Sequence, residues 1–349
     1  MYKVCPTCDT QIAKTSKQWK RQIYCSDKCR KVAHRKASST NKRIEQRRAN
    51  MPQNDEVLLL VRQCRRAKTV QILQGHDTVS FTITMALVKN RPKFDVNLCH
   101  ISPVKGKGCI GLFHYKNLFY GGSYQNKKIG NKSFGKGLSI KTTELLKEWS
   151  VSEQTSTNDI LIKIELYLGG VIEEYLKLSS VRKSKKAQIS NKICTLDDTE
   201  CFDDLIQTSH TALVAKLSKL SNSPSFKLPE KKRESKYINY IDELSRFISY
   251  KDTGWRHLTT IRGLIITGYV ALSKIKESNT YNKDMTTKYQ SLINPHRNAK
   301  LKSKTQWSAF KDAMYEAAFH ALQGETASLT ALQRMMSKYL KSSKLNTPK

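Results

Sequence analysis

The segment NLCHISPVKGKGCIGLFHYKNLFYGGSYQNKKIGNKS, residues 97–133 of a chain of 349 residues, decides what fold to expect at the centre of the protein. Residues 97–104 are typical of a strand that carries His100 near its end and stops at Pro103, before a loop of glycine and lysine. Residues 111–122 predict a second strand context that includes Asn117, and residues 123–132 predict a short helix that carries Asn126. The segment therefore predicts the order strand, loop, strand, helix.

The same segment is cationic throughout. No Asp or Glu occurs between Asp95 and Glu144. We expect its lysines to form a surface that holds a phosphate backbone. They are Lys105, Lys107, Lys116, Lys127, Lys128, Lys132 and Lys136.

The order of a histidine at a strand end, an asparagine before leucine and an asparagine on the next helix resembles the HNH, or His-Me finger, endonucleases. The resemblance covers about residues 95–136 and lies in the cues CHIxPV, HxxNL and NxxxGNK. It implies a small ββα-metal core within residues 54–148 and hydrolysis of phosphodiester bonds, most simply in double-stranded DNA. In that family the histidine removes a proton from water, because imidazole titrates near neutral pH.

The resemblance also assigns roles to individual residues. His100 takes the place of the general base, and Asn117 that of the residue that orients the imidazole. Cys99 and Asn126 take the places that hold one divalent cation, such as Mg²⁺ or Mn²⁺. The chain departs from most members at Cys99, where they carry Asp, His or Glu and where a hard cation prefers a carboxylate. A softer ion, or help from His114 or Asp95, is left open.

Plainer interpretations exist for each residue. His100 can be an ordinary strand histidine, Asn117 can cap a turn, and Asn126 can be a surface residue of the helix. A second hypothesis is therefore a non-catalytic regulator that binds DNA or RNA through a degenerate HNH-like scaffold. A third is a basic protein that packages nucleic acid.

Four cysteines open the chain as two pairs, Cys5 with Cys8 and Cys25 with Cys29. Two close pairs separated by a short polar stretch are what a tetrahedral Zn²⁺ site requires, and the residues between the pairs can form a hairpin. Residues 1–36 resemble the short zinc ribbons that open bacterial and phage DNA-processing proteins. His34 is a spare ligand or a residue of a solvated helix. The alternative is four unrelated buried cysteines.

A basic stretch, KCRKVAHRKASSTNKRIEQRR, follows over residues 28–48 with Glu45 as its one acid. Because it cannot bury a core, it is a solvated helix or a flexible arm. Because the stretch lies next to a zinc site, we expect it to contact phosphates. The contact residues expected within the ribbon are Arg30, Lys31, Arg35 and Lys36, and residues 37–53 are expected to form a basic linker or arm. Met51 and Pro52 mark the boundary.

Composition restricts the class of partner. The formal net charge is +33, which points to a polyanion, and nucleic acid is the first choice. The longest apolar runs, residues 58–61 and 264–272, are too short to span a bilayer, and the start has no apolar signal region. We therefore expect a cytoplasmic protein without a membrane partner, in which cysteines are metal ligands or buried thiols.

The rest of the chain is predicted to be mainly helical. Asn54 is expected to cap a helix, while residues 70–73 and 79–88 are rich in β-branched residues and indicate strands, or a strand and a helix. Apolar spacing predicts helices from residues 158 and 203 within 158–220, and further helices within 237–341, separated by a loop at 221–236. A helix-turn-helix with Gly263 or Gly268 at its turn is an alternative within 258–275. The overall expectation is an α+β protein with a zinc ribbon, an HNH-like core and a helical carboxyl-terminal region, whose oligomeric state the sequence leaves open.

Overall fold

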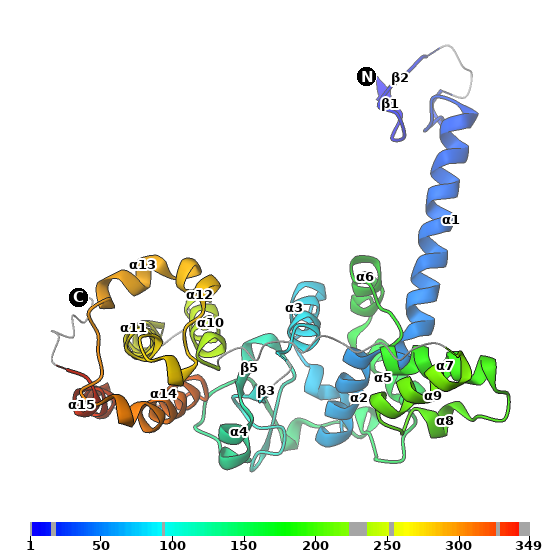
Figure 1. The fold of residues 1–349 in the computed structure, drawn as a ribbon. Helices are drawn as coiled ribbons and strands as arrows, with labels where there is room; N and C mark the ends of the chain where they lie inside the picture. The colour runs from blue at the N-terminus through cyan, green and yellow to red at the C-terminus, as the bar shows by residue number, and fades with distance from the viewer. Residues whose placement is uncertain are drawn as a thin grey trace. The chain divides into compact units, whose positions relative to one another are not determined.

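The computed structural model describes residues 2–14, 19–92, 95–222, 236–250, 255–325 and 329–341. It is mixed α+β and mostly helical, and three two-stranded antiparallel sheets lie within these ranges. The chain divides into two compact units, residues 1–58 with 172–225, and residues 59–171 with 226–349 (Figure 1). The expected α+β class is confirmed.

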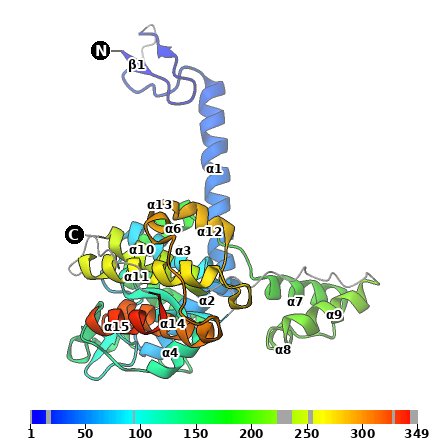
Figure 2. The same ribbon diagram turned by 60° about the vertical axis from the view of Figure 1, so that its left-hand side comes forward.

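The first unit begins with a hairpin of β1 (Lys3–Val4) and β2 (Gln11–Ile12). The hairpin encloses the first cysteine pair rather than lying between the two pairs, as the sequence suggested. The long helix α1 (Asp27–Asn50) follows and runs through residue 36 without a break. This unit also contains α7 (Lys185–Leu196), α8 (Phe202–Leu205) and α9 (His210–Leu220), with α7 and α9 side by side and α8 at their connection (Figure 2).

Helix α1 is held at its two ends. At the start, the Ser26 side chain accepts a hydrogen bond from the backbone N–H of Cys29 at 3.3 Å. At the end, Arg47 donates to the carbonyl of Leu176 at 2.6 Å, in helix α6 (Val171–Leu178). No residue of α1 is buried. The helix therefore lacks an apolar face that packs on a core.

In the first part of the second unit, the sequence left open two strands or a strand and a helix, and the structure has the helix but not the strand. Residues 79–88 lie in α3 (Thr78–Lys89), and residues 70–73 form a 3-10 turn, Val70–Leu73. The reason is local capping: Asp77 accepts from the backbone N–H of Ser80, and Ser80 accepts from that of Asp77. The predicted cap at Asn54 is confirmed, because its side chain accepts from the backbone N–H of Val57 at the start of α2 (Asp55–Ala67).

The central segment forms the predicted order. β3 (Val96–His100) pairs antiparallel with β5 (Leu118–Gly122), and α4 (Ser123–Ile129) follows directly. The loop between the two strands contains β4 (Cys109–Gly111), which pairs with β6 (Ser139–Lys141). The helix is shorter than expected, since it ends before Gly130, whose φ is +62°.

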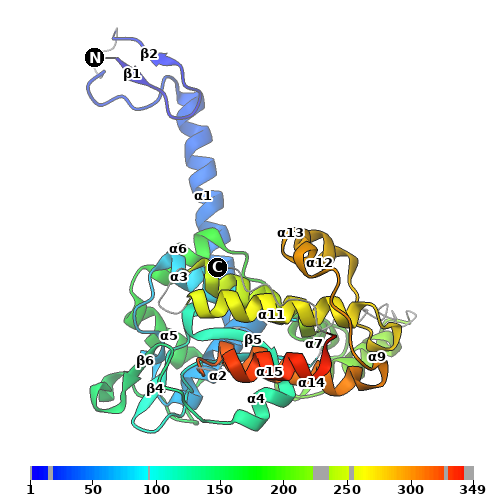
Figure 3. The ribbon, with the colours of Figure 1, turned by 90° about the vertical axis from the view of Figure 1, so that its left-hand side faces the viewer.

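Helices of the carboxyl-terminal part pack against the β3–β5 hairpin and build one apolar core with it (Figure 3). Cys99 and Phe119 join the hairpin to that core. Gly121 and Gly122 lie within β5, where a Cβ at Gly121 would meet the Phe319 ring at 2.6 Å. The helices are α10 (Lys236–Ser249), α11 (Trp255–Ser273), α12 (Lys283–Lys288), α13 (Gln290–Ile293), α14 (Trp307–Leu322) and α15 (Leu329–Tyr339).

Several predicted helices have other boundaries. α11 is one continuous helix, so a helix-turn-helix with its turn at Gly263 or Gly268 is wrong. A Cβ at Gly268 would lie 2.6 Å from Met314 Sδ, which explains the glycine as a close helix contact. The helix expected from residue 158 divides into α5 (Thr157–Leu168) and α6 at Gly169, and the one expected from residue 203 divides into α8 and α9.

Most of the loop expected at 221–236 lies outside the described ranges. The remaining short 3-10 turns are Met51–Gln53, Tyr115–Asn117, Thr142–Glu144, Lys147–Trp149, Lys276–Ser278, Asn294–His296 and Lys304–Gln306. In the part of the chain that the structure describes, no helix combines the length and the apolar character needed to cross a bilayer.

Candidate metal centre and nucleic-acid interface

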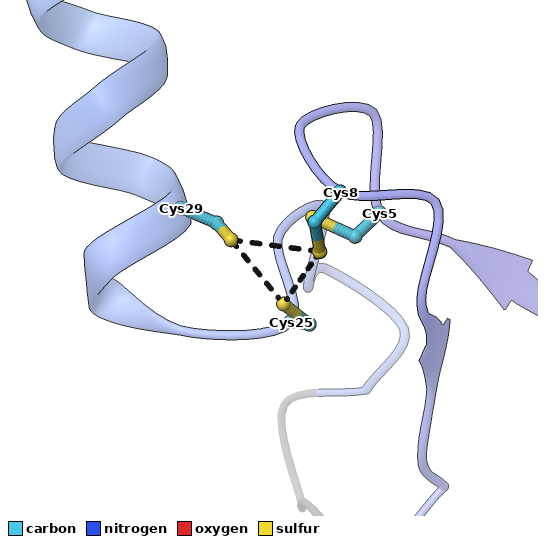
Figure 4. A group of neighbouring side chains, drawn as sticks. All are labelled: Cys5, Cys8, Cys25 and Cys29. Carbon is cyan, nitrogen blue, oxygen red and sulfur yellow. Dashed lines mark hydrogen bonds between the residues drawn. The ribbon is translucent and has the colours of Figure 1, made fainter.

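The four amino-terminal cysteines form one cluster (Figure 4). Their sulfur atoms all lie within 4.8 Å of one another. Individual Sγ–Sγ distances are 3.3 Å from Cys8 to Cys25, 3.5 Å from Cys25 to Cys29 and 3.6 Å from Cys29 to Cys8. A tetrahedral zinc ion with bonds of about 2.3 Å sets its sulfur ligands about 3.8 Å apart, so the cluster has the dimensions of such a site.

Local structure brings the cysteines together. Cys5 and Cys8 lie in the turn of the β1–β2 hairpin, where the backbone N–H of Cys5 donates to Thr10 and that of Asp9 donates to Cys5. Cys29 lies in the first turn of α1, and Cys25 precedes that helix. Lys3 Nζ donates to the carbonyls of Lys20 at 2.7 Å and Trp19 at 3.1 Å. These two hydrogen bonds hold the segment that precedes Cys25 against the hairpin.

The protonation of the thiols fits a metal site. A hydrogen bond from the backbone of Cys25 lowers the pKa of the Cys5 thiol to about 6. Hydrogen bonds to the neighbouring Cys8 and Cys29 sulfurs raise the pKa of the Cys25 thiol to about 12, because they stabilise its protonated form. A divalent cation replaces such protons and offsets the repulsion between the thiolates that bind it, so these four residues can hold a metal such as zinc. His34 is exposed two turns along α1 and does not belong to the cluster.

Helix α1 carries its charges asymmetrically. With about 100° between successive residues, the basic residues of one half fall within an arc of about 140°, and Asp27, His34 and Glu45 lie along one border of that arc, beside Lys31 and Lys42. A helix of 24 residues is about 36 Å long, which gives this side the length of several phosphate spacings. We call this side the cationic half of α1: Lys28, Lys31, Arg35, Lys36, Lys42 and Arg43.

The second predicted site centres on His100, a half-buried residue whose imidazole has one ring nitrogen buried in the protein. His100 Nε2 is buried and has no hydrogen-bond partner, and the Phe113 ring lies 6.0 Å away between centroids. Burial lowers the pKa of His100 to about 3, with a further lowering by Arg66. The imidazole is therefore neutral at pH 7, and its ring nitrogen is withdrawn from water.

Asn117 acts on the loop rather than on the imidazole. Its Nδ2 donates to the carbonyls of Ser102 at 3.2 Å and Leu112 at 2.8 Å. Its Oδ1 accepts from the backbone N–H groups of Ser102 at 2.9 Å and Leu138 at 3.1 Å. These four bonds to backbone use the full hydrogen-bonding capacity of the amide, so the predicted role of orienting His100 is replaced by a clamp on three loop segments.

The predicted cation ligands do not form a group with other ligands. Cys99 is 1% exposed in the apolar core, and burial raises the pKa of its thiol to about 12. The physical reason is strand geometry, since successive side chains of β3 point to opposite faces and Cys99 therefore faces away from His100. Asn126 is half-buried on α4. Within the described ranges, the four amino-terminal cysteines are the one group of three or more His, Cys, Asp or Glu side chains placed to hold an ion.

The predicted lysines lie where they can meet a polyanion. Lys105, Lys107, Lys127, Lys128 and Lys132 are exposed, and Lys116 is half-buried. Lys128 pairs with Glu316 at 3.4 Å while its side chain stays 57% exposed. Of the basic residues near the cysteines, Arg30 pairs with Asp27 at 3.0 Å, and Lys31, Arg35 and Lys36 are exposed on α1.

Some residues of interest were not singled out from the sequence. Lys42 and Arg43 complete the cationic half of α1, and helical periodicity applied to residues 28–48 would have found them. Tyr124 is 66% exposed on α4, and its place one turn before Lys127 and Lys128 was visible in the sequence. The hydrogen bonds of Lys3 had no sequence signal, because they join residues brought together by folding.

Comparisons with known proteins add no assignment: no protein-family model, no curated protein and no solved structure matches this chain.

Proposed function

We propose that the chain binds nucleic acid through α1, with a zinc ion on Cys5, Cys8, Cys25 and Cys29 as the anchor of that helix. The observation that carries the proposal is the position of Cys29 in the first turn of a helix without buried residues. A metal bound there fixes the start of α1 to the hairpin, and the helix then presents its cationic half to solvent. Its most direct partner is the phosphate backbone of double-stranded DNA.

The net charge of +33 supports the same partner. A polycationic surface binds nucleic acid by releasing condensed counterions, so affinity falls steeply with salt. The salt slope is the steepness with which the logarithm of the binding constant falls against the logarithm of the salt concentration. Each lost phosphate contact lowers this slope by about 0.9, so the slope counts the contacts.

The test compares duplex binding of the native chain with a triple variant of the cationic half, Lys31→Gln, Arg35→Gln and Lys42→Gln. We expect the variant to bind more weakly and to lose about 2–3 from the salt slope. The matched control removes the same charge from α7 and α9 with Lys185→Gln, Lys192→Gln and Lys219→Gln. Equal losses in both variants, or no duplex binding by the native chain at low salt, would reject α1 as the contact.

The role of the metal is tested separately. We expect about one zinc per chain, and a Cys5→Ser, Cys8→Ser variant should lose both the metal and most of the binding contributed by α1. Retention of full metal content by that variant would exclude the four-cysteine site.

Hydrolysis by an HNH-type site is the second candidate, and the order β3, β5, α4 with His100 at the end of β3 is the observation that favours it. Two features favour binding without hydrolysis. Nε2 of His100 is buried and the imidazole has a pKa of about 3, which suits a general base poorly. Cys99 lies in the core and is not available as a ligand.

Plasmid cleavage distinguishes the two candidates. The chain is incubated with plasmid and Mg²⁺, Mn²⁺, Ni²⁺ or Zn²⁺, beside His100→Ala. We expect binding without cleavage. Metal-dependent cleavage that His100→Ala abolishes would instead assign hydrolysis to this site.

A further inference from the structure

Helix α4 divides into a buried side and an exposed side. Gln125 and Ile129 are buried, 5% and 8% exposed, and fix the helix to the second unit. Tyr124, Lys127 and Lys128 fall on the other side, because positions three and four apart share a helical face. Tyr124 is 66% exposed, although it is a large aromatic residue in a unit whose core buries many other rings.

The surroundings of Tyr124 are cationic. Lys127 and Lys128 lie one turn further along α4, and Lys132 and Lys136 follow in the exposed loop after it. No carboxylate comes from residues 96–143. Two come from outside this range: Glu316 on α14 pairs with Lys128, and Asp95, whose carbonyl accepts from the backbone N–H of Ser123 at 2.8 Å, pairs with Lys236 at 3.9 Å. An aromatic face is thus presented beside several ammonium groups.

We infer that α4 binds single-stranded nucleic acid, with one base stacked on Tyr124 and the flanking phosphates held by Lys127, Lys128 and Lys132. A single strand offers both the π-face of a base and the adjacent phosphates, and aromatic residues beside basic ones are how proteins bind such strands. A duplex keeps its base faces within the stack and offers only phosphates. The surface therefore selects unpaired nucleotides, and none of its residues belongs to the cationic half of α1.

This inference names a second substrate form for the proposed nucleic-acid binding, but it rests on α4 and can be tested alone. The probe is a single-stranded oligonucleotide with 2-aminopurine in its centre, whose fluorescence falls when the base stacks on a ring. We expect the native chain to quench the probe. Tyr124→Ala should remove the quenching and weaken single-strand affinity by about tenfold to a hundredfold, while Tyr124→Phe keeps both.

Controls separate stacking from charge and from folding. Tyr281→Ala removes another exposed tyrosine of the same unit, 63% exposed, which is followed by Lys283, and should leave quenching and affinity unchanged. Lys127→Gln with Lys132→Gln should weaken binding and lower the salt slope while the bound probe stays quenched.

The outcomes also distinguish this inference from the proposal for α1. Tyr124→Ala should leave duplex binding unchanged, and the triple variant of the cationic half of α1 should leave probe quenching unchanged. Absence of single-strand binding by the native chain, equal effects of Tyr124→Ala and Tyr281→Ala, or an equal loss of duplex and single-strand affinity in Tyr124→Ala would overturn the inference. None of these results depends on whether α1 binds the duplex.

Discussion

At the scale of single residues, Asn117 is the most constrained polar side chain of the central hairpin. It is fully buried, and its amide joins the loop backbone at Ser102, Leu112 and Leu138. Gly137 stands beside it with φ at +88°, and a Cβ there would lie 2.2 Å from Asn117 Oδ1. The long loop between β3 and β5 therefore depends on one amide and on the absence of one side chain.

We predict that Asn117→Ala lowers the free energy of unfolding by about 3 kcal/mol or more, because buried backbone groups of Ser102 and Leu112 lose their partners. Urea denaturation measures the change. Asn126→Ala, at a half-buried position on α4, is the matched control and should cost under about 1 kcal/mol. An unfolding free energy unaffected by Asn117→Ala would show that the clamp contributes nothing to stability.

His100 gives the second unit a dependence on pH. Burial lowers its pKa to about 3 from a usual 6.5, so the folded chain takes up the proton less readily than the unfolded chain. The stability that depends on neutral His100 is complete above pH 6.5 and is lost as pH falls toward 3. The slope approaches about 1.4 kcal/mol per pH unit.

The comparison for this prediction is His100→Gln, which cannot titrate. Urea denaturation between pH 7 and about pH 4 should show a smaller loss of stability in the variant than in the native chain. The pKa of His114 is also lowered, to about 4, so His114 adds its own pH dependence to both chains. The difference in unfolding free energy between the native chain and His100→Gln therefore isolates the contribution of His100. Parallel curves would mean that His100 is accessible to protons in the folded state.

At the scale of elements, helix α10 occupies the free edge of β5. The backbone N–H of Tyr120 donates to Glu243 at 3.1 Å, and that of Gly122 donates to Tyr240 Oη at 2.9 Å. Arg246 donates to the carbonyl of Leu118 at 2.6 Å. Side chains of a helix thus satisfy the groups that a third strand would pair, which protects an edge that otherwise invites association.

This arrangement depends on a buried ion pair. Glu243 is 3% exposed and meets Arg246 at 2.5 Å. Burial raises the pKa of the Glu243 carboxyl, while Arg246 and the Tyr120 N–H act in the opposite direction. Removing one partner leaves the other charge buried and uncompensated.

We predict that Glu243→Gln costs about 3 kcal/mol of unfolding free energy, because Arg246, whose side chain is 18% exposed, then stays largely buried without a counter-ion. Asp242→Asn on the same helix is the control. Asp242 pairs with Lys288 at 2.8 Å on the solvent side, where the Lys288 side chain is 57% exposed and the Asp242 side chain is 38% exposed. Loss of this ion pair should cost under about 1 kcal/mol of unfolding free energy. Equal costs for the two substitutions would contradict the special position of the buried pair.

At the scale of the whole molecule, the two units differ in what stabilises them. The second unit has a large apolar core of its own, built from β3, β5 and the helices from α10 to α15. The cysteine cluster and α1 have few buried side chains, with Cys5 and Ile12 as the buried residues of the hairpin. A metal ion can therefore contribute much of the stability around the cluster and little to the second unit.

Chelation tests this difference. We predict that removing zinc raises hydrogen exchange in residues 3–12 and in the first turns of α1, because the cysteines that join them then repel one another. Exchange in β3, β5 and α11 should stay as it was. An equal increase in both units would show that folding of the second unit depends on the metal.

The sequence by itself determined the features that depend on neighbours along the chain. The spacing of Cys5, Cys8, Cys25 and Cys29 predicted a cluster, and the apolar and basic patterns predicted the strand, loop, strand, helix order and most helices. Turns, caps and helical periodicity act over a few residues, so a linear pattern contains them. Local capping also decides between the alternatives that the sequence left open for residues 79–88, which form a helix.

Only the tertiary structure decided what each side chain of the central segment contacts. The sequence placed Cys99 beside His100, but β3 sends the thiol into the core with Phe119 and leaves His100 Nε2 enclosed without a partner. The sequence predicted that Asn117 orients the imidazole of His100, whereas its amide binds backbone groups as far away as Leu138. The edge of β5 is covered by α10, more than a hundred residues further along the chain. Such contacts depend on which distant surfaces pack together, and no local pattern contains that information.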